Sequence, residues 1–215
     1  VQEGEQKAIR KGGFFWLASA PFSKEPPLFL VPFGKHSAFP PMAHELLFAH
    51  LGRHLQLTEE EQTRVAHVFQ PAIFPRKSFL QRQGEPCPYI YFVNRGLLRA
   101  YVLGENGKDS TVMFAVKDWW ITDMYCFVNQ VPAMVNIQAV KDTEVLRLSW
   151  EDLEQLYQTV PSFERLFRIL MQNAYCREQL RVIQNLTLSA AERYAGFITK
   201  YPQIAQRITQ KQIAS

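Results

Sequence analysis

Few residues in this sequence combine a reactive side chain with a spacing that supports catalysis. His50 and His54 lie four residues apart, so both could face one metal ion from a helix, but no third ligand and no HExxH glutamate accompanies them. The cysteines, Cys87, Cys126 and Cys176, form no CxxC pair, which argues against a cysteine-rich zinc site or a four-cysteine iron–sulfur cluster. No nucleophile elbow, P-loop or dinucleotide fingerprint follows a predicted strand. The sequence therefore predicts no enzyme, no metal and no resident cofactor.

The clearest interaction pattern lies near the C-terminus, where residues recur at the spacing of a coiled-coil seam. Such spacing is typical of a helix that pairs with a second copy of itself, and a polar residue at an a position, here Asn173, fixes register and oligomeric state. A second apolar face of the same helix, including Phe163 and Phe167, would cover its own domain. The pattern favours a homodimer over a helix buried in one core. The predicted dimer seam comprises Leu166, Ile169, Asn173, Cys176, Leu180 and Ile183.

Turn and cap signals show which elements carry these residues. Thr58–Glu61 and Ser149–Asp152 are capping patterns that begin helices, and Pro71 is expected to end the first of them. Residues 72–148 alternate in polarity and carry glycine turns, which is typical of a barrel or sandwich of short strands and not of a parallel α/β sheet. Within them, residues 118–134 are expected to be rich in loops.

The C-terminal part is predicted to be helical and is basic. A long helix is expected over about 162–186, a capped helix between Ser189 and Pro202, and a further helix start at Thr209. Residues 159–215 carry eight Lys/Arg and three Asp/Glu. A basic end of this kind is an electrostatic footprint for nucleic acid, with a solvated helix surface as the alternative.

Composition places the chain among globular proteins. Its 215 residues are 47% hydrophobic and 20% charged, which is enough apolar surface for a sizeable core. No run approaches the roughly 18 apolar residues of a membrane-spanning helix, and the widely spaced cysteines fit a reducing, cytoplasmic setting. Residues 1–41 differ from the rest because glycines and prolines interrupt any helical or strand periodicity of the apolar residues. The hypothesis that follows is that this segment is upstream read-through and that translation begins at Met42.

In this order, the parts resemble the Crp/Fnr family of bacterial transcription regulators. The resemblance rests on Tyr91–Arg99, a strand–turn–strand with Gly96 at its turn, on the strand pair within residues 136–149, and on Ile208–Ala214. The last of these is similar to the opening of a helix-turn-helix. The match covers about residues 46–215. The family's fold is a cyclic-nucleotide-binding-type β-roll, a dimerisation helix and a C-terminal winged helix-turn-helix.

The resemblance implies an α+β fold, an antiparallel β-roll (cupin-like jelly roll) with flanking helices, a long dimerisation helix and a truncated winged helix-turn-helix. The expected domains are an irregular segment over 1–41, the sensor roll over 42–160, the dimerisation helix over 161–187 and the start of the DNA-binding domain over 188–215. The implied function is a DNA-binding transcription regulator that responds to an unknown effector. The rival interpretation is a stand-alone β-roll sensor or interaction module that never binds DNA.

The DNA-binding end is expected to be incomplete. The recognition helix should follow Ser215, so that the 215-residue chain by itself should bind DNA poorly. The implied partners are DNA, a second copy of the chain and RNA polymerase, with no membrane. The expected phosphate contacts are Thr209, Gln210 and Lys211.

The ligand pocket departs from the family's cyclic-AMP pattern. In cyclic-AMP binders a Gly–Glu pair holds the ribose, and an Arg–Ser pair with backbone N–H groups holds the cyclic phosphate. Counting places these pairs at Ile121–Thr122 and Ala133–Met134, so the glycine, the acid and the arginine are missing, although Asp123 lies one step from the acid. Cyclic AMP is therefore expected to bind weakly or not at all, and aromatic residues that merely fill the roll are the alternative to any effector. The hypothetical effector pocket comprises Trp120, Thr122, Asp123, Tyr125, Ala133, Met134 and Gln179.

Overall fold

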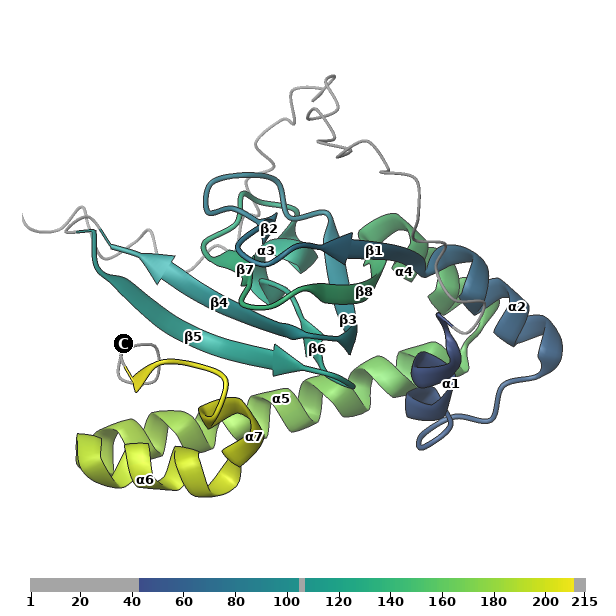
Figure 1. Ribbon diagram of the computed structural model, residues 1–215. Coiled ribbons are helices and arrows are strands. Elements are labelled where there is room, and N and C mark those ends of the chain that lie inside the picture. The colour runs from purple at the N-terminus through teal and green to yellow at the C-terminus, as the bar shows by residue number, and fades with distance from the viewer. Residues whose placement is uncertain (1–42, 105–106, 211–215) are drawn as a thin grey trace, which may run out of the picture. The chain divides into compact units, whose positions relative to one another are not determined.

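The computed structural model describes residues 43–104 and 107–210. Within them, two helices, α1 (Glu45–Leu51) and α2 (Glu59–Val68), precede a β-roll, and further helices follow it (Figure 1). The strands of the roll are β1 (Gln70–Phe74), β2 (Phe79–Gln81), β3 (Tyr89–Arg95), β4 (Leu97–Leu103), β5 (Asp109–Val116), β6 (Trp120–Ile121), β7 (Asn136–Ala139) and β8 (Thr143–Ser149).

The strands form two four-stranded antiparallel sheets. Their orders are β1-β8-β3-β6 and β2-β7-β4-β5. Both sheets contribute to one buried apolar cluster, in which Tyr91 and Val145 of the first sheet join Leu98 and Ile137 of the second. This arrangement confirms the predicted mixed fold with an antiparallel β-roll.

The turn between β3 and β4 requires glycine. Gly96 has a φ of +111°, which other residues rarely adopt, and a Cβ at this position would collide with Thr143 and with the backbone of Asp142. The Thr143 hydroxyl instead accepts a hydrogen bond from the N–H of Leu97 at 3.3 Å. The glycine of the Tyr91–Arg99 motif thus allows the β7–β8 turn to lie against the β3–β4 turn.

Two local elements differ from the sequence expectation. Helix α2 ends at Val68, and Pro71 lies inside β1, an edge strand, where its missing N–H removes no bond from the middle of a sheet. Residues 118–134, expected to be rich in loops, contain β6 and a short helix, α3 (Met124–Asn129), which is capped by the Asp123 side chain.

The C-terminal helices begin at the predicted caps. The Ser149 and Ser189 side chains each accept a hydrogen bond from the backbone N–H three residues further along. None of the described helices is long and apolar enough to cross a membrane. These helices are α4 (Trp150–Thr159), α5 (Ser162–Thr187), α6 (Ala190–Lys200) and α7 (Pro202–Ala205).

The first turns of α5 are part of the core of the sensor domain. Phe163 and Leu166 are fully buried, and Phe167 is nearly so, in the cluster that also holds Phe69 and Phe92. The far end of the helical part returns to the roll, because Ile204 of α7 is buried in a cluster with residues of β4 and β5. The two ends of the helical region are therefore both attached to the roll.

Candidate functional site

Four of the predicted pocket residues lie close together, namely Thr122, Asp123, Ala133 and Met134. The Thr122 hydroxyl donates a hydrogen bond to the Tyr89 carbonyl at 2.9 Å. The Ala133 N–H donates to the Glu85 carbonyl at 2.8 Å. These bonds fasten the segments before and after α3 to the chain that leads into β3.

The Asp123 carboxylate is the centre of this group. The residue is only 6% exposed. One carboxylate oxygen accepts hydrogen bonds from the N–H groups of Met134 at 2.8 Å and Val135 at 3.2 Å, and the other accepts from the N–H of Cys126 at 3.4 Å. Three backbone donors thus converge on one buried carboxylate and hold the loop after α3 against the start of that helix.

The other predicted pocket residues lie apart from this group. Tyr125 is 62% exposed, and the Met134 side chain points to solvent, with the residue 49% exposed. Gln179 is exposed on α5 and donates a hydrogen bond to the Tyr175 hydroxyl at 3.0 Å. Within one chain, no hydrogen bond of the described residues joins Tyr125 or Gln179 to Asp123.

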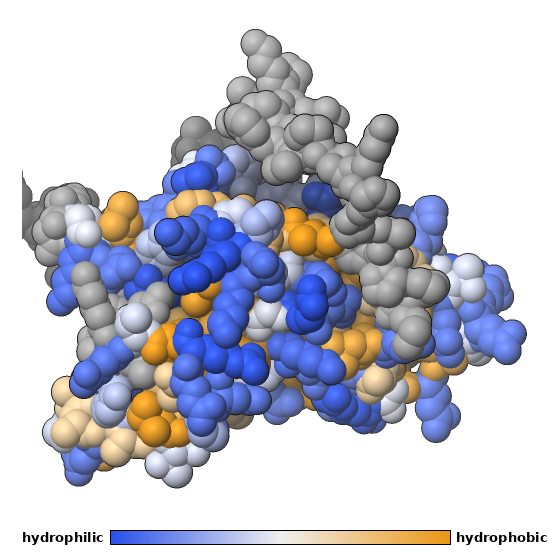
Figure 2. Space-filling model, in the orientation of Figure 1, coloured by the Kyte–Doolittle hydropathy of each residue, from blue (hydrophilic) through white to orange (hydrophobic). Residues whose placement is uncertain are grey.

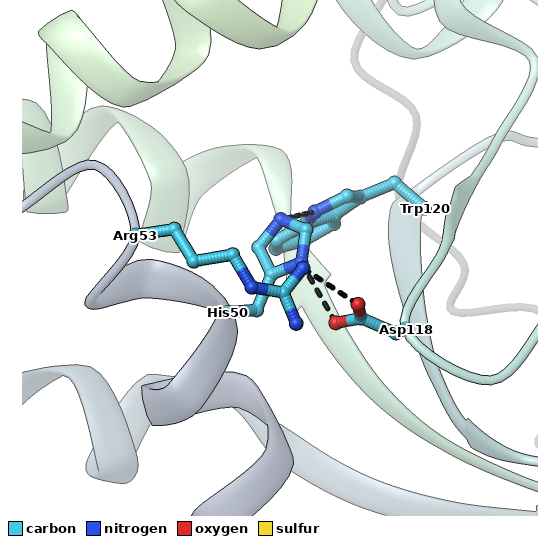
Figure 3. Close-up of polar contacts among 4 residues, drawn as sticks. All are labelled: His50, Arg53, Asp118 and Trp120. Carbon is cyan, nitrogen blue, oxygen red and sulfur yellow. Dashed lines mark hydrogen bonds and ion pairs between the residues drawn. The ribbon is translucent and has the colours of Figure 1, made fainter.

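Trp120 takes part in a different contact, where α1, the roll and α5 meet (Figure 3). Its indole N–H donates to Nε2 of His50 at 3.1 Å, and its ring lies edge-on to Phe167 of α5. Nδ1 of His50 lies 2.8 Å from one carboxylate oxygen of Asp118, and the guanidinium of Arg53 lies 2.7 Å from the other. The contact therefore joins a residue of the predicted pocket to the base of the predicted dimer helix.

These bonds determine the protonation state of His50. The Trp120 indole nitrogen can only donate, so Nε2 of His50 is an acceptor and the imidazole proton resides on Nδ1, from which it is donated to Asp118. Burial lowers the pKa of His50 below its usual value, although the neighbouring Asp118 carboxylate favours the charged form. His50 is therefore neutral near pH 7, and it fastens Trp120 to the loop at Asp118.

The spacing of residues in the sequence did not identify this contact. The sequence suggests a role for His50 only through its spacing from His54, as one of two possible metal ligands on a helix. Asp118 lies 68 positions from His50, and no helical or strand period connects residues that far apart. In the described part of the chain, no three His, Cys, Asp or Glu side chains are grouped as a metal site would require.

Unreactive thiols and a buried amide lie beside the Asp123 group. Gln81 is 4% exposed, and among the described residues its amide meets only the weakly hydrogen-bonding Cys87 thiol. The Cys87 sulfur lies 3.7 Å from the Thr122 hydroxyl. Burial raises the pKa of Cys87 and of Cys126, so both remain protonated thiols at neutral pH and neither is an activated nucleophile.

An open apolar pocket of about 290 Å³ lies between α3, α4 and α5. No member of the predicted effector pocket lines it. Its walls include Met124, Phe127, Trp150, Tyr157 and Phe167.

The predicted dimer seam divides into a buried and an exposed part. Leu166 is buried inside its own domain and Ile169 is half-buried. From Asn173 onward the seam is exposed, with Cys176 open to solvent and Leu180 and Ile183 exposed by 47% and 56%. Apolar surface is also visible in the space-filling view at the lower left, in the region of α5 and α6 (Figure 2).

The predicted DNA contacts lie at the end of the described residues. Thr209 and Gln210 are exposed, and Gln210 has helical backbone geometry. Lys211 lies outside the described residues.

Comparison with known proteins places the roll in a family. Residues 72–160 match the family model of the cyclic nucleotide-binding domain. The "Transcriptional activator protein anr" of Pseudomonas aeruginosa is 25% identical over 161 residues, which cover 74% of this chain and 65% of that protein. The "Anaerobic regulatory protein" of Pasteurella multocida is 22% identical over 143 residues, covering 66% of this chain and 52% of that protein. The chain thus spans less than two thirds of either curated relative.

Solved structures agree on the fold. The Thermus thermophilus catabolite activator protein matches with a TM-score of 0.55 and 21% identity, covering 74% of this chain and 72% of its own. A putative transcriptional regulator of the Crp/Fnr family from Eubacterium rectale matches with a TM-score of 0.60 and 18% identity, covering 74% and 76%. Residues 72–160 thus match the cyclic nucleotide-binding domain, and the two curated relatives are named as a transcriptional activator and a regulatory protein.

Proposed function

We propose that this chain is the sensor and dimerisation part of a DNA-binding transcription regulator of the Crp/Fnr type, which acts in the cytoplasm as a homodimer. The sensor comprises residues 42–160 and the dimerisation helix residues 161–187, and the DNA-binding domain starts at residue 188. The names of the two curated relatives support the regulatory role. The intact protein would bind a pseudo-palindromic site and work with RNA polymerase, its recognition helix following Ser215.

The exposed part of the α5 seam is the observation that carries this proposal. Leu180 and Ile183 lie about one helical turn apart, and both are about half exposed. Tyr175 and Leu186, at 65% and 81%, add apolar surface to the same helix. Contiguous exposed apolar surface marks an interaction site. A second α5 laid along it would bury these side chains and pair Asn173 with its counterpart across the two-fold axis.

Two aromatic contacts, one near each end of α4, connect α3 to α4 and α4 to α5. Phe127 of α3, which Asp123 caps, lies edge-on to Trp150 of α4 with ring centres 5.4 Å apart. Tyr157 of α4 lies edge-on to Phe167 of α5 at 5.8 Å. An effector that displaces the loop after α3 would therefore shift α4 and the base of α5, and with them the two DNA-binding domains of a dimer.

The dimer is tested by replacing a seam residue with a charge. Leu180→Asp should convert the dimer to monomers, because it places two carboxylates across the seam. The matched control is Val182→Asp, since Val182 is 55% exposed but lies off the seam on the same helix. Light scattering after gel filtration should give dimers for the wild type and for Val182→Asp. Dimers that persist in Leu180→Asp would refute the α5 seam.

DNA binding is tested with the natural full-length protein on fragments of its own genome. Retention of a fragment by the wild type, and its loss in Leu180→Asp, supports a dimeric regulator. A dimer that retains no fragment at any effector or salt condition would favour the stand-alone sensor or interaction module.

A further inference from the structure

We propose that Asp123 acts as an internal anion, which occupies the backbone amides that would otherwise hold a ligand phosphate and so makes this roll select an uncharged effector. The inference rests on the effector site of the proposed function and adds the chemical class of its ligand.

The geometry of the amides supports this role. The N–H groups of Met134 and Val135 are consecutive in the chain, and both donate to the same carboxylate oxygen of Asp123. Successive backbone N–H groups that converge in a loop make an anion-binding concavity. Here the anion comes from the chain itself. An incoming phosphate oxygen could reach these donors only by displacing the carboxylate.

The charge balance around Asp123 leads to the same conclusion. Among the described residues, no Lys, Arg or His side chain makes an ion pair with Asp123, so no cation balances its charge, and its hydrogen bonds come from backbone amides and from the Cys126 thiol. A phosphate bound beside it would be a second negative charge in a buried site without a cation, which is strongly unfavourable. The carboxylate therefore excludes anions both by occupying their donors and by repelling them.

The neighbouring polar groups suit a neutral ligand. Gln81 is buried, and among the described residues its amide meets only the weakly hydrogen-bonding Cys87 thiol. The Cys87 thiol lies within 3.6 Å of the Asp123 carbonyl and 3.7 Å of the Thr122 hydroxyl. A small uncharged molecule with one hydrogen-bond donor and one acceptor could bond to both amide atoms of Gln81. It would leave the hydrogen bonds between Asp123 and the backbone amides in place.

The test removes the carboxylate while keeping the helix cap. In Asp123→Ser the hydroxyl still caps α3, because serine is a good N-cap residue, but the Met134 and Val135 amides lose their partner. The matched control is Asp142→Ser, since Asp142 is an exposed carboxylate that accepts one backbone N–H, from Arg76 at 2.7 Å. Cyclic AMP and inorganic phosphate are titrated calorimetrically into the 215-residue chain of each variant.

Wild type and Asp142→Ser should bind both probes weakly at best, with dissociation constants in the millimolar range or above, whereas Asp123→Ser should bind cyclic AMP or phosphate at least about tenfold more tightly. If Asp123→Ser does not fold, Asp123→Asn keeps the acceptor oxygen, removes only the charge, and should still bind more tightly than the wild type. A folded variant with no gain for either probe, or micromolar cyclic-AMP binding by the wild type, would overturn the inference. These titrations need neither dimer nor DNA, so their failure is distinct from failure of the proposed function.

Discussion

Single side chains hold the junction between the roll and the helices. His50 accepts a hydrogen bond from the Trp120 indole N–H on Nε2 and donates one to the Asp118 carboxylate from Nδ1. Protonation would put a hydrogen on Nε2, opposite the indole N–H, and would break the bond to Trp120. Because Trp120 contacts Phe167, acid pH is expected to loosen the base of α5.

The lowered pKa of His50 predicts a pH dependence of stability. A histidine that is harder to protonate in the folded state stabilises the fold above its unfolded pKa, about 6.5, and this contribution is lost as the pH falls below that value. Replacing His50 with Gln keeps one acceptor and one donor but cannot titrate. The wild type should therefore lose more thermal stability between pH 7.5 and pH 5 than His50→Gln does.

His54→Gln is the control for this comparison, because His54 lies one helical turn away and makes no hydrogen bond to Trp120 or Asp118 among the described residues. It should keep the steep pH dependence of the wild type. Equal slopes for the wild type and His50→Gln would contradict the assigned role of His50.

Two glycines should respond to the same substitution with opposite signs. Gly96→Ala should cost about 2 kcal/mol or more of unfolding free energy, because Gly96 has a positive φ and no room for a Cβ beside Thr143. Gly196→Ala should stabilise by about 0.5–1 kcal/mol, since Gly196 lies inside α6 with open space around it. Urea denaturation measures both. A neutral Gly96→Ala would show that the β3–β4 turn is less constrained than the geometry indicates.

At the scale of elements, local signals in the sequence were sufficient for the helix caps and the long strands. The Ser149 and Ser189 caps act over three residues, so the spacing alone identifies them. Short elements could not be predicted, because α3 has six residues and α7 has four, too few to show a period. Pro71 signalled the end of α2 but gave no sign that a strand would include it.

The candidate site was predictable only in part. Contacts between residues close together in the sequence could be expected from its pattern, but contacts between distant residues could not. Asp123 lies 11 and 12 positions from the Met134 and Val135 amides it binds, and the family resemblance points to this segment. Trp120 was assigned to the same pocket, but its partners lie far along the chain, and the fold places it at the α1–α5 junction instead.

At the scale of the whole molecule, the sensor and the dimerisation helix share one core. Phe163 and Phe167 are buried in the sensor domain, whereas Leu180 and Ile183 of the same helix are exposed. A rigid helix with one half in each environment would transmit a displacement in the roll to a partner chain. Signal transfer of this kind requires that two α5 helices pair in parallel and in register.

Oxidative cross-linking through Cys176 tests the pairing of the two α5 helices directly. Cys176 is the exposed free cysteine, whereas Cys87 and Cys126 are buried, and it occupies a d position where its counterpart would lie within disulfide distance. Mild oxidation should produce a species of twice the 25.0 kDa chain mass on a non-reducing gel, absent in Cys176→Ser and in Leu180→Asp. A wild-type chain that stays at its monomer mass, or a Leu180→Asp variant that cross-links equally well, would contradict a dimer built on α5.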